Sequence, residues 1–203
     1  MMKGLHDTTE QNEYWTGRYH SQNTGWDIGQ PSTPLATYID QLKDKSVKIL
    51  IPGAGNAYEA QYLWEQGFAN VYVLDISPIP LANLQARVPD FPTAQLLHGN
   101  FFEHSGQYDL ILEQTFFCSF EPTDTLRTAY ALQMHSLLKT GGRLVGLWFD
   151  IPLAPQGSRP YGGSREQYLA YLAPPLTCRV LEPCFNSIPP RMGNELFGIF
   201  QKS

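Results

Sequence analysis

The sequence predicts an α/β domain built on a mostly parallel, seven-stranded sheet with helices on both faces. Three observations support this fold: apolar β-branched runs alternate with helical segments, a glycine turn joins the first strand to its helix, and the next strand ends in an acid. Strands that alternate with helices form parallel sheets covered on both sides. The 203 residues, 42% of them hydrophobic and 16% charged, suffice for one well-packed core. We therefore expect residues 1–203 to form a single domain.

Residues 1–45 precede the first strand and are expected to form a helical cap. Its parts are a helix over 12–20, a loop over 25–30 and a helix over 35–42 that Ser32 and Pro34 begin. Trp15, Tyr19 and Trp26 stand out in this polar segment. Two readings are open for these rings: they anchor the cap to the core, or they form a lid whose faces meet a bound cation.

The central motif of the chain is a strand, a glycine turn, a helix and a second strand. Its parts are residues 47–51, the turn 52–56 with Gly53 and Gly55, residues 57–66 and residues 71–74. Glycine lets the turn bend tightly and lets a ligand approach the backbone closely. Asp75 ends the second strand, where an acid accepts hydrogen bonds from ribose hydroxyls. This order is the first half of a Rossmann-like nucleotide site.

The turn departs from the dinucleotide-binding pattern at Tyr58, which takes the place of the third glycine in G-x-G-x-x-G. That glycine lets the helix approach closely enough to hold a pyrophosphate on its N-terminus. S-adenosylmethionine (SAM) carries adenine, ribose and an amino acid but no phosphate. The motif therefore suits SAM better than NAD.

The rest of the chain continues the alternation. Helices are expected over 77–88, 123–138 and 164–173, and strands over 94–98, 108–113, 143–149, 178–181 and 195–201. The closing pair of strands resembles a hairpin, so one strand of the seven should be antiparallel. Lys139 to Gly142 supplies a cation and glycines that are typical of a helix end. Residues 150–163 are rich in proline and glycine and form a candidate lid.

Composition excludes several classes of function. The net charge of −5 argues against nucleic acid, which selects basic surfaces. We expect neither a signal peptide, because residues 1–13 are polar, nor a membrane span, because no apolar run is long enough. The three cysteines and five histidines lack the spacing of metal ligands. We expect a cytoplasmic protein that binds no metal, nucleic acid or membrane.

Ligands of open α/β sheets bind beyond the carboxyl ends of the strands, where the strand order reverses. The expected ligand contacts at these ends are Gly53, Gly55, Asp75, Ile76, Asn100, Phe101, Glu113 and Gln114. In this arrangement Asp75 holds ribose and Asn100 with Phe101 meets adenine. Glu113 and Gln114 lie toward the amino acid end of the ligand. For Phe101, core packing is an equally acceptable reading.

Later segments carry a more specific resemblance. They are residues 25–30 (GWDIGQ), 51–55 (IPGAG), 74–77 (LDIS), 116–122 (FFCSFEP), 160–161 (PY) and 186–191 (NSIPPR). From Trp15 to the C-terminus, the chain resembles class I SAM-dependent methyltransferases of the thiopurine methyltransferase type. It is most similar to their thiol and halide methyltransferase branch.

The resemblance implies a cofactor, SAM, and residues that contact it. These are Trp15, Tyr19, Trp26, Gly53, Asp75, Asn100, Phe101 and Gln114. Tyr161 corresponds to an aromatic residue near the acceptor. The chain departs from the family at Tyr19, where plant relatives have tryptophan, and at Asn100, where aspartate is usual. An asparagine carbonyl still accepts from an adenine amino group, so SAM binding should survive.

We expect the chain to be a monomeric enzyme that transfers the methyl group of SAM to a small thiol, sulfide or halide. Such nucleophiles are already anionic and need no strong base, in accord with a sequence that shows no evident catalytic pair. The candidate residues around the acceptor are Phe116, Phe117, Tyr161 and Arg191, and all but Phe116 are candidate catalytic residues. Arg191 either attracts an anionic acceptor or forms a surface salt bridge.

Three alternatives remain open at this point. The acceptor is an aromatic thiol of the thiopurine kind or a metalloid oxyanion. The chain is a SAM- or nucleotide-binding module without catalysis. It is an NAD(P)-dependent oxidoreductase, against which the missing third glycine argues.

Overall fold

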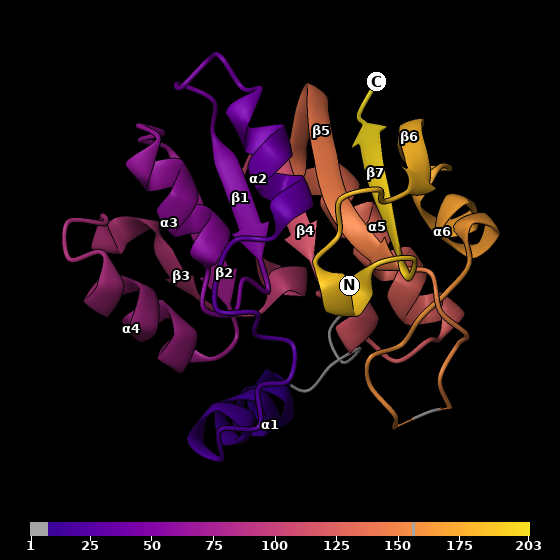
Figure 1. The fold of residues 1–203 in the computed structure, drawn as a ribbon, viewed down its shortest axis with the longest axis horizontal. Helices are drawn as coiled ribbons and strands as arrows, with labels where there is room; N and C mark the ends of the chain where they lie inside the picture. Colours follow the sequence, from indigo (N-terminus) through magenta and orange to yellow (C-terminus); the bar gives the residue numbers. More distant parts are fainter. Residues whose placement is uncertain (1–7, 156) are drawn as a thin grey trace.

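The computed structural model describes residues 8–155 and 157–203, in which seven strands form one sheet of order β3-β2-β1-β4-β5-β7-β6 (Figure 1). The strands are β1 (Ile49–Pro52), β2 (Val71–Asp75), β3 (Leu96–His98), β4 (Tyr108–Gln114), β5 (Leu138–Phe149), β6 (Thr177–Pro183) and β7 (Glu195–Gln201). Strand β7 runs antiparallel to both its neighbours, and the other pairs are parallel. The predicted sheet with one antiparallel strand is confirmed.

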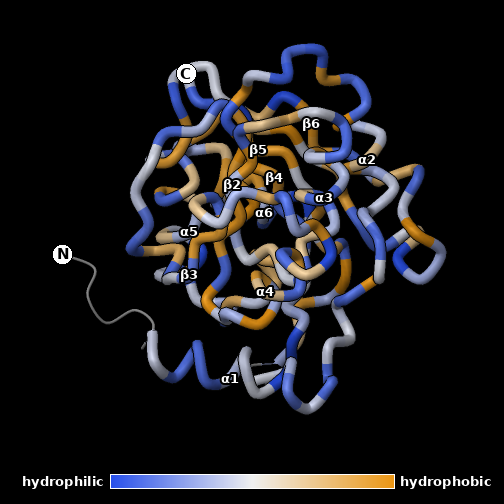
Figure 2. Tube along the Cα trace, turned by 90° about the vertical axis from the view of Figure 1, so that its left-hand side faces the viewer, coloured by the Kyte–Doolittle hydropathy of each residue, from blue (hydrophilic) through white to orange (hydrophobic). Residues whose placement is uncertain are grey.

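Helices cover both faces of this sheet, as the alternation predicts. The covering helices are α2 (Thr33–Asp40), α3 (Tyr58–Glu65), α4 (Pro78–Arg87), α5 (Asp124–Leu137) and α6 (Arg165–Leu172), and helix α1 (Thr8–His20) precedes them in the chain. Successive side chains of a strand point to opposite faces. Ile49 and Ile51 therefore pack in the core under α2, α3 and α4, whereas Leu50 packs in the core under α5 and α6. Figure 2 shows these strands as a hydrophobic interior wrapped by more hydrophilic helices.

The strand order reverses between β1 and β4, because β2 and β3 extend the sheet to one side and β5, β7 and β6 to the other. This reversal separates the connections that leave the carboxyl ends of β1 and β4, so a crevice opens there. Helix α1 has no buried residue and lies across this end of the sheet, apart from the layered body (Figures 1 and 2). The first seven residues of the predicted cap lie outside the described residues.

The boundary between α5 and β5 differs clearly from the prediction. Residues 139–142 were expected to end a helix, but α5 already ends at Leu137 and β5 begins at Leu138. The lysine that favoured a helix end forms a salt bridge instead, with 2.8 Å between Lys139 Nζ and Asp109 Oδ1. A register shift between Tyr108 and Leu110 accommodates this early start of β5.

Candidate functional site

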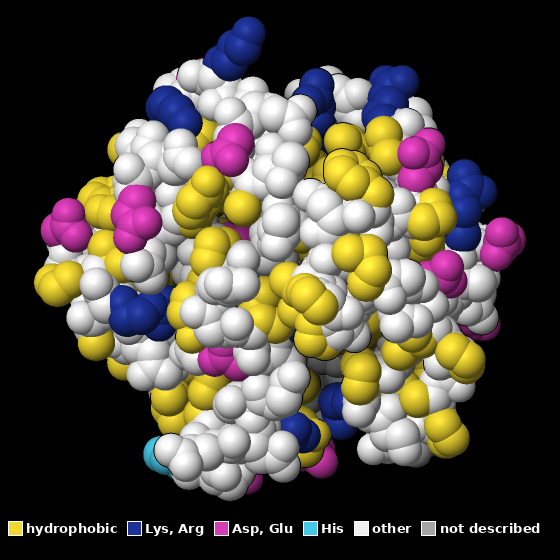
Figure 3. All heavy atoms as spheres, in the orientation of Figure 1, with side chains coloured by type: hydrophobic (Ala, Val, Ile, Leu, Met, Phe, Trp, Pro, Cys, Tyr) yellow, Lys and Arg dark blue, Asp and Glu magenta, His cyan; other side chains and the backbone are white. Residues whose placement is uncertain are grey.

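A cavity of about 510 Å³ lies at the carboxyl ends of the central strands, within the size range of pockets that hold drug-sized ligands. Cap helix α1 covers one side of it, and the loop after β5 borders another. In Figure 3, basic side chains lie in the lower part of this face, where α1 meets the body of the domain. The site predicted at the strand ends therefore exists as a hollow with walls from distant segments.

The glycine turn forms the floor of the cavity, and a side chain at Gly53 would collide with a neighbouring ring. Gly53 and Gly55 both have left-handed backbone, with φ of +55° and +54°. A Cβ at Gly53 would lie 1.9 Å from the Phe116 ring, and one at Gly55 would lie 3.4 Å from Tyr19 Oη. Aromatic side chains of the protein thus lie close to this backbone, and the close approach of a ligand stays a prediction.

Asp75 lines the cavity next to this turn and is only 8% exposed. The Gly55 N–H donates to Oδ2 at 3.0 Å, and the Ser77 N–H donates to Oδ1 at 2.8 Å. Burial raises the pKa of this carboxyl to about 6, although both hydrogen bonds act to lower it. A carboxylate has about four acceptor positions, so two remain for a ligand.

The three cap aromatics predicted to bind the cofactor all line the cavity. Trp26 lies between the other two: its ring centroid is 5.3 Å from that of Trp15 and 5.7 Å from that of Tyr19, both in edge-to-face contact. Burial raises the pKa of Tyr19, and the nearby Asp75 raises it further, so its hydroxyl stays neutral. The rings form one aromatic wall over the glycine turn.

Ile76 and Asn100 line the cavity, but both also hold the cap in place. The Ile76 carbonyl accepts from Asn12 of α1 at 2.5 Å. Asn100 Nδ2 donates to Thr8 Oγ1 at 3.0 Å, while its Oδ1 accepts from the Phe102 N–H at 3.0 Å. The Asn100 amide thus keeps one acceptor lone pair for an adenine amino group.

Phe101 also lines the cavity and is buried. Its ring stands edge to face with Phe116 at a centroid distance of 5.1 Å. The ring packs in the core and also borders the cavity, so the core-packing reading holds and the contact with adenine stays a prediction.

Glu113 does not line the cavity. It is fully buried, and its Oε1 accepts from the Phe116 and Phe117 N–H groups at 2.8 and 2.9 Å. Burial raises the pKa of this carboxyl to about 7. Glu113 therefore shapes the turn after β4, which was not the contact that its place at a strand end predicted.

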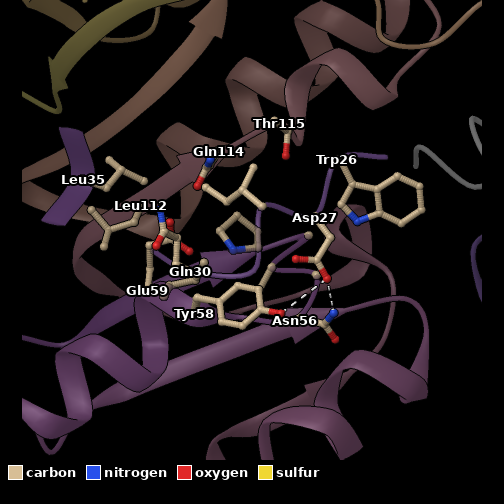
Figure 4. A pocket seen from close by; sticks show the side chains of 16 residues that line it. Trp26, Asp27, Gln30, Leu35, Asn56, Tyr58, Glu59, Leu112, Gln114 and Thr115 are labelled. Atoms are coloured by element: carbon tan, nitrogen blue, oxygen red, sulfur yellow. Dashed lines mark hydrogen bonds between the residues drawn. The ribbon is translucent and has the colours of Figure 1, made fainter. Parts of the chain in front are cut away.

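A smaller pocket of about 50 Å³ lies beside the main cavity and contains Gln114 (Figure 4). The amide orientation that satisfies the neighbours lets Gln114 donate to Glu59 Oε1 at 2.7 Å and accept from Arg191 at 3.0 Å. In the same view, Asp27 accepts hydrogen bonds from Asn56 and Tyr58. The pocket is thus a polar joint between cap and glycine turn, and Gln114 does not reach the main cavity.

Arg191 lines the cavity from the C-terminal part of the chain. It is only 8% exposed, and its Nη1 lies 3.3 Å from Glu195 Oε1. Its Nη2 donates to the Trp26 carbonyl at 3.1 Å and so ties the cap to residues 189–191. The predicted salt bridge of Arg191 exists, with Glu195 as its partner, but it is buried and does not lie at the surface as expected.

Two candidate acceptor residues lie behind the cavity wall. Phe117 is buried against Tyr130 and Tyr168, with centroid distances of 4.8 and 5.5 Å. Tyr161 is also buried, and its hydroxyl donates to Glu121 Oε1 at 2.6 Å. Neither residue lines the cavity, because adjacency in a motif does not tell which side of a turn a side chain takes.

Sequence reasoning missed several cavity residues. They are Gln11, Arg18, Phe120 and Arg159. Their closeness depends on how α1, the turn after β4 and the loop after β5 pack together, which no local pattern encodes. For Arg159 the one available signal was its position next to the Pro160-Tyr161 motif.

The sequence was compared with known families and proteins. A model of the family described as thiopurine S-methyltransferase (TPMT) matches residues 10–182. "Probable thiol methyltransferase 2" of Arabidopsis thaliana is 31% identical over 93% of this chain and 84% of that protein. "Thiocyanate methyltransferase 1" of the same plant is 28% identical over 98% of this chain and 88% of that protein.

Solved structures share the fold at low sequence identity. A 1,6-didemethyltoxoflavin-N1-methyltransferase of Burkholderia thailandensis superimposes with a TM-score of 0.76 and 19% identity, over 100% of this chain and 93% of that one. A magnesium protoporphyrin IX methyltransferase of Synechocystis gives a TM-score of 0.71 and 15% identity over the full length of both. These likenesses establish the Rossmann-like methyltransferase fold.

Proposed function

This chain belongs to the thiopurine S-methyltransferase family and is a SAM-dependent methyltransferase of the thiol methyltransferase type, and we propose that its acceptor is a small soft nucleophile such as a thiol, bisulfide, thiocyanate or halide. The family excludes both the oxidoreductase and the module without catalysis. The proposal therefore concerns the acceptor and the residues that serve it.

The cavity fits the parts of SAM. Asp75 keeps two acceptor positions for ribose hydroxyls beside a turn in which both glycines have left-handed backbone and Gly53 has no space for a side chain. The cap rings of Trp15, Tyr19 and Trp26 line the cavity, and aromatic rings attract a sulfonium cation. We propose that Gly53, Gly55 and Asp75 hold the nucleoside side and that the cap closes over the cation.

The observation that carries the acceptor class is the lack of a base. Among the described residues that line the cavity, Asp75 is the one carboxylate, and neither histidine nor lysine is present. Asp75 already accepts two backbone hydrogen bonds. Cys118 lines the cavity too, but burial raises the pKa of its thiol, so it stays protonated. Oxygen and nitrogen acceptors usually need a base, whereas an anionic sulfur or halide does not.

The volume of the cavity supports a small acceptor. About 510 Å³ lies in the range of pockets that hold one drug-sized molecule, and SAM is of that size. Little space then remains for a second large molecule. This favours bisulfide, thiocyanate, iodide or a short thiol over an aromatic thiol or a larger acceptor.

Bound SAM supplies a methyl group on a positively charged sulfur. The acceptor anion attacks the methyl carbon in line with the carbon–sulfur bond, which breaks, so that the charges of the acceptor and of the sulfonium are both neutralised. Both charges shrink in the transition state, so water stabilises the reactants more than the transition state. The wall formed by Phe101, Phe116 and Phe120 replaces that water with weakly polar surface. Holding donor and acceptor aligned contributes up to roughly 7–11 kcal/mol in favourable systems.

The test measures S-adenosylhomocysteine formation from SAM with one acceptor at a time: bisulfide, thiocyanate, iodide, an aromatic thiol and a catechol. We expect turnover with the first three and little with the last two. Turnover confined to the aromatic thiol would overturn the small-acceptor proposal in favour of a thiopurine-like function. An arsenite or tellurite arm tests metalloid acceptors in the same assay.

Three wider expectations stay proposals: one domain over residues 1–203, a monomer, and a cytoplasmic location. No helix of the described residues is long and apolar enough to cross a membrane. Cys118, Cys178 and Cys184 are free thiols, which suits a reducing compartment. Within the same residues, no group of three or more His, Cys, Asp or Glu side chains has the arrangement of a metal site.

A further inference from the structure

Three arginines line the cavity, and two of them have their donors engaged. Arg18 donates from Nε and Nη2 to Asn23, and from Nη1 to Tyr14. These bonds hold the turn after α1. Its guanidinium also stacks 5.1 Å from the Trp26 ring centroid. Arg18 is therefore a part of the cap structure.

Arg191 is similarly committed. Its Nη1 faces Glu195 at 3.3 Å and the Gln114 carbonyl oxygen at 3.0 Å, and its Nη2 donates to the Trp26 carbonyl. A neighbouring carboxylate compensates its charge. Arg191 is thus poorly suited to the anion-attracting role that its position in the sequence suggested.

Arg159 differs from both. Its Nε donates to the Ser119 carbonyl at 2.8 Å, which fixes the side chain. Within residues 8–155 and 157–203, neither terminal nitrogen has a hydrogen-bond partner and no carboxylate lies within 4.0 Å. This half-buried guanidinium presents two unused nitrogens beside the cavity.

Aromatic rings surround this guanidinium. Its central carbon lies 4.9 Å from the Tyr14 centroid and 5.7 Å from those of Trp15 and Tyr161. The rings limit access of water to the group, so that its charge is less screened than on an open surface. Guanidinium is also weakly hydrated, and this lowers the cost of pairing it with an anion.

We propose that Arg159 binds the methyl acceptor as a small, polarisable monovalent anion, such as thiocyanate, iodide or a thiolate, and that it selects anionic over neutral acceptors. This inference rests on the proposed function, since it names the residue that recognises its substrate class. The terminal nitrogens donate to the anion while the Nε bond to Ser119 keeps the guanidinium at the cavity.

The direct test is anion binding, which needs no methyl transfer. Chloride NMR line broadening is measured on the protein with and without S-adenosylhomocysteine, and thiocyanate is added as the competing anion. Wild type should show excess broadening that thiocyanate removes. In Arg159→Gln this excess should fall about tenfold, the range for a hydrogen bond to a charged group. Equal broadening in wild type and Arg159→Gln would overturn the proposal.

Two further variants separate recognition from general effects. Arg179→Gln removes the same charge from an exposed site on β6, where the side chain bonds Gln201, and should leave the broadening unchanged. Arg159→Lys keeps the charge but lacks the planar guanidinium, so it should retain part of the excess line broadening. A loss equal to that of Arg159→Gln in the Arg179→Gln variant would count against a local site.

Kinetics then distinguish binding from a purely structural role. For Arg159→Gln, the KM for thiocyanate should rise about tenfold, with kcat, the melting temperature and S-adenosylhomocysteine affinity nearly unchanged. A fall in melting temperature and cofactor affinity without a KM change would make Arg159 a loop anchor and overturn the proposal. If anions bind through Arg159 but no acceptor is methylated, the proposed function fails and the anion site stands.

Discussion

Two regions of the cavity are built in opposite ways. The turn region, residues 52–77, comes from one continuous stretch and presents mostly backbone, with Gly53, Gly55 and Asp75 held by local hydrogen bonds. The closing region brings the cap, the loop after β5 and residues 189–191 together through side chains such as Arg159 and Arg191. Their contacts join residues up to 165 positions apart. The geometry of the turn region therefore follows from local sequence, whereas the geometry of the closing region depends on contacts between distant side chains.

The largest expected effect comes from the turn region. Asp75→Ala removes the proposed acceptor for both ribose hydroxyls, so SAM affinity should fall by about 100-fold, as expected for two hydrogen bonds to a charged group. Calorimetry with S-adenosylhomocysteine measures it. The control is Asp109→Ala, which removes an acid near the start of β4, away from the cavity. Its exposed ion pair with Lys139 contributes little to stability, and SAM affinity should not change. Affinity within a factor of two of wild type would break the assignment of Asp75.

The second effect tests how closely the turn is packed. Gly53→Ala forces a Cβ into the Phe116 ring and strains a left-handed backbone, so unfolding free energy should fall by about 2–3 kcal/mol and SAM affinity about tenfold. Gly67→Ala is the control: its φ is +86° but no atom lies within 4 Å, so it should cost about 1 kcal/mol and spare SAM binding. Combining Gly53→Ala with Phe116→Ala should recover stability relative to the sum of both changes.

The third effect concerns the buried carboxylates at the strand ends. The pKa of Glu113 is raised from 4.5 to about 7 and that of Asp75 from 3.8 to about 6. The folded state therefore binds more protons than the unfolded state between pH 4 and 7, and stability must fall as pH rises through this window. For Glu113 the shift corresponds to roughly 3 kcal/mol at most.

Urea unfolding at pH 5 and pH 8 measures this dependence. Glu113→Gln keeps an oxygen for the Phe116 and Phe117 N–H groups, so it should flatten the pH profile and leave the smaller contribution of Asp75. Glu182→Gln, at an exposed carboxylate on β6, should behave like wild type. A wild-type protein more stable at pH 8 than at pH 5 would contradict the assignment.

The smallest expected effect lies behind the closing region. Tyr161→Phe removes the hydroxyl that bonds Glu121 and the Gly157 N–H, so stability should fall by about 1 kcal/mol with kcat within about twofold of wild type. Tyr171→Phe, which loses a hydroxyl bond to Asp124 at the surface, is the matched variant. A tenfold loss of kcat in Tyr161→Phe at unchanged melting temperature would return Tyr161 to the reaction.

Sequence reasoning succeeded where structure is local. The apolar runs that became β1 and β2, the glycine turn and Asp75 lie within one stretch, and their periodicity and turn chemistry determine their conformation. The predicted helix end at Lys139 was wrong, because a lysine suits both the last turn of a helix and a strand position where it forms a salt bridge, here with Asp109. Only the register of β4 and β5 decides between them.

The closing region could not be derived in this way. Phe117 and Tyr161 stand in specific motifs, yet both are buried. Phe117 is buried in the turn after β4, and the Tyr161 hydroxyl is hydrogen-bonded to Glu121. Arg159 belongs to no recognised motif. Its proposed role in binding the acceptor anion depends on rings of α1 that lie about 145 positions away in the sequence. Such contacts follow from tertiary packing, which a single sequence does not reveal.

The most direct test of the account is a competition for one pool of SAM among equimolar bisulfide, thiocyanate, iodide, an aromatic thiol and a catechol. Product ratios give the relative kcat/KM values within a single tube, independent of enzyme concentration. We expect methylated small anions to dominate the products and Arg159→Gln to lower their share. Dominance of the methylated aromatic thiol or catechol would contradict this expectation.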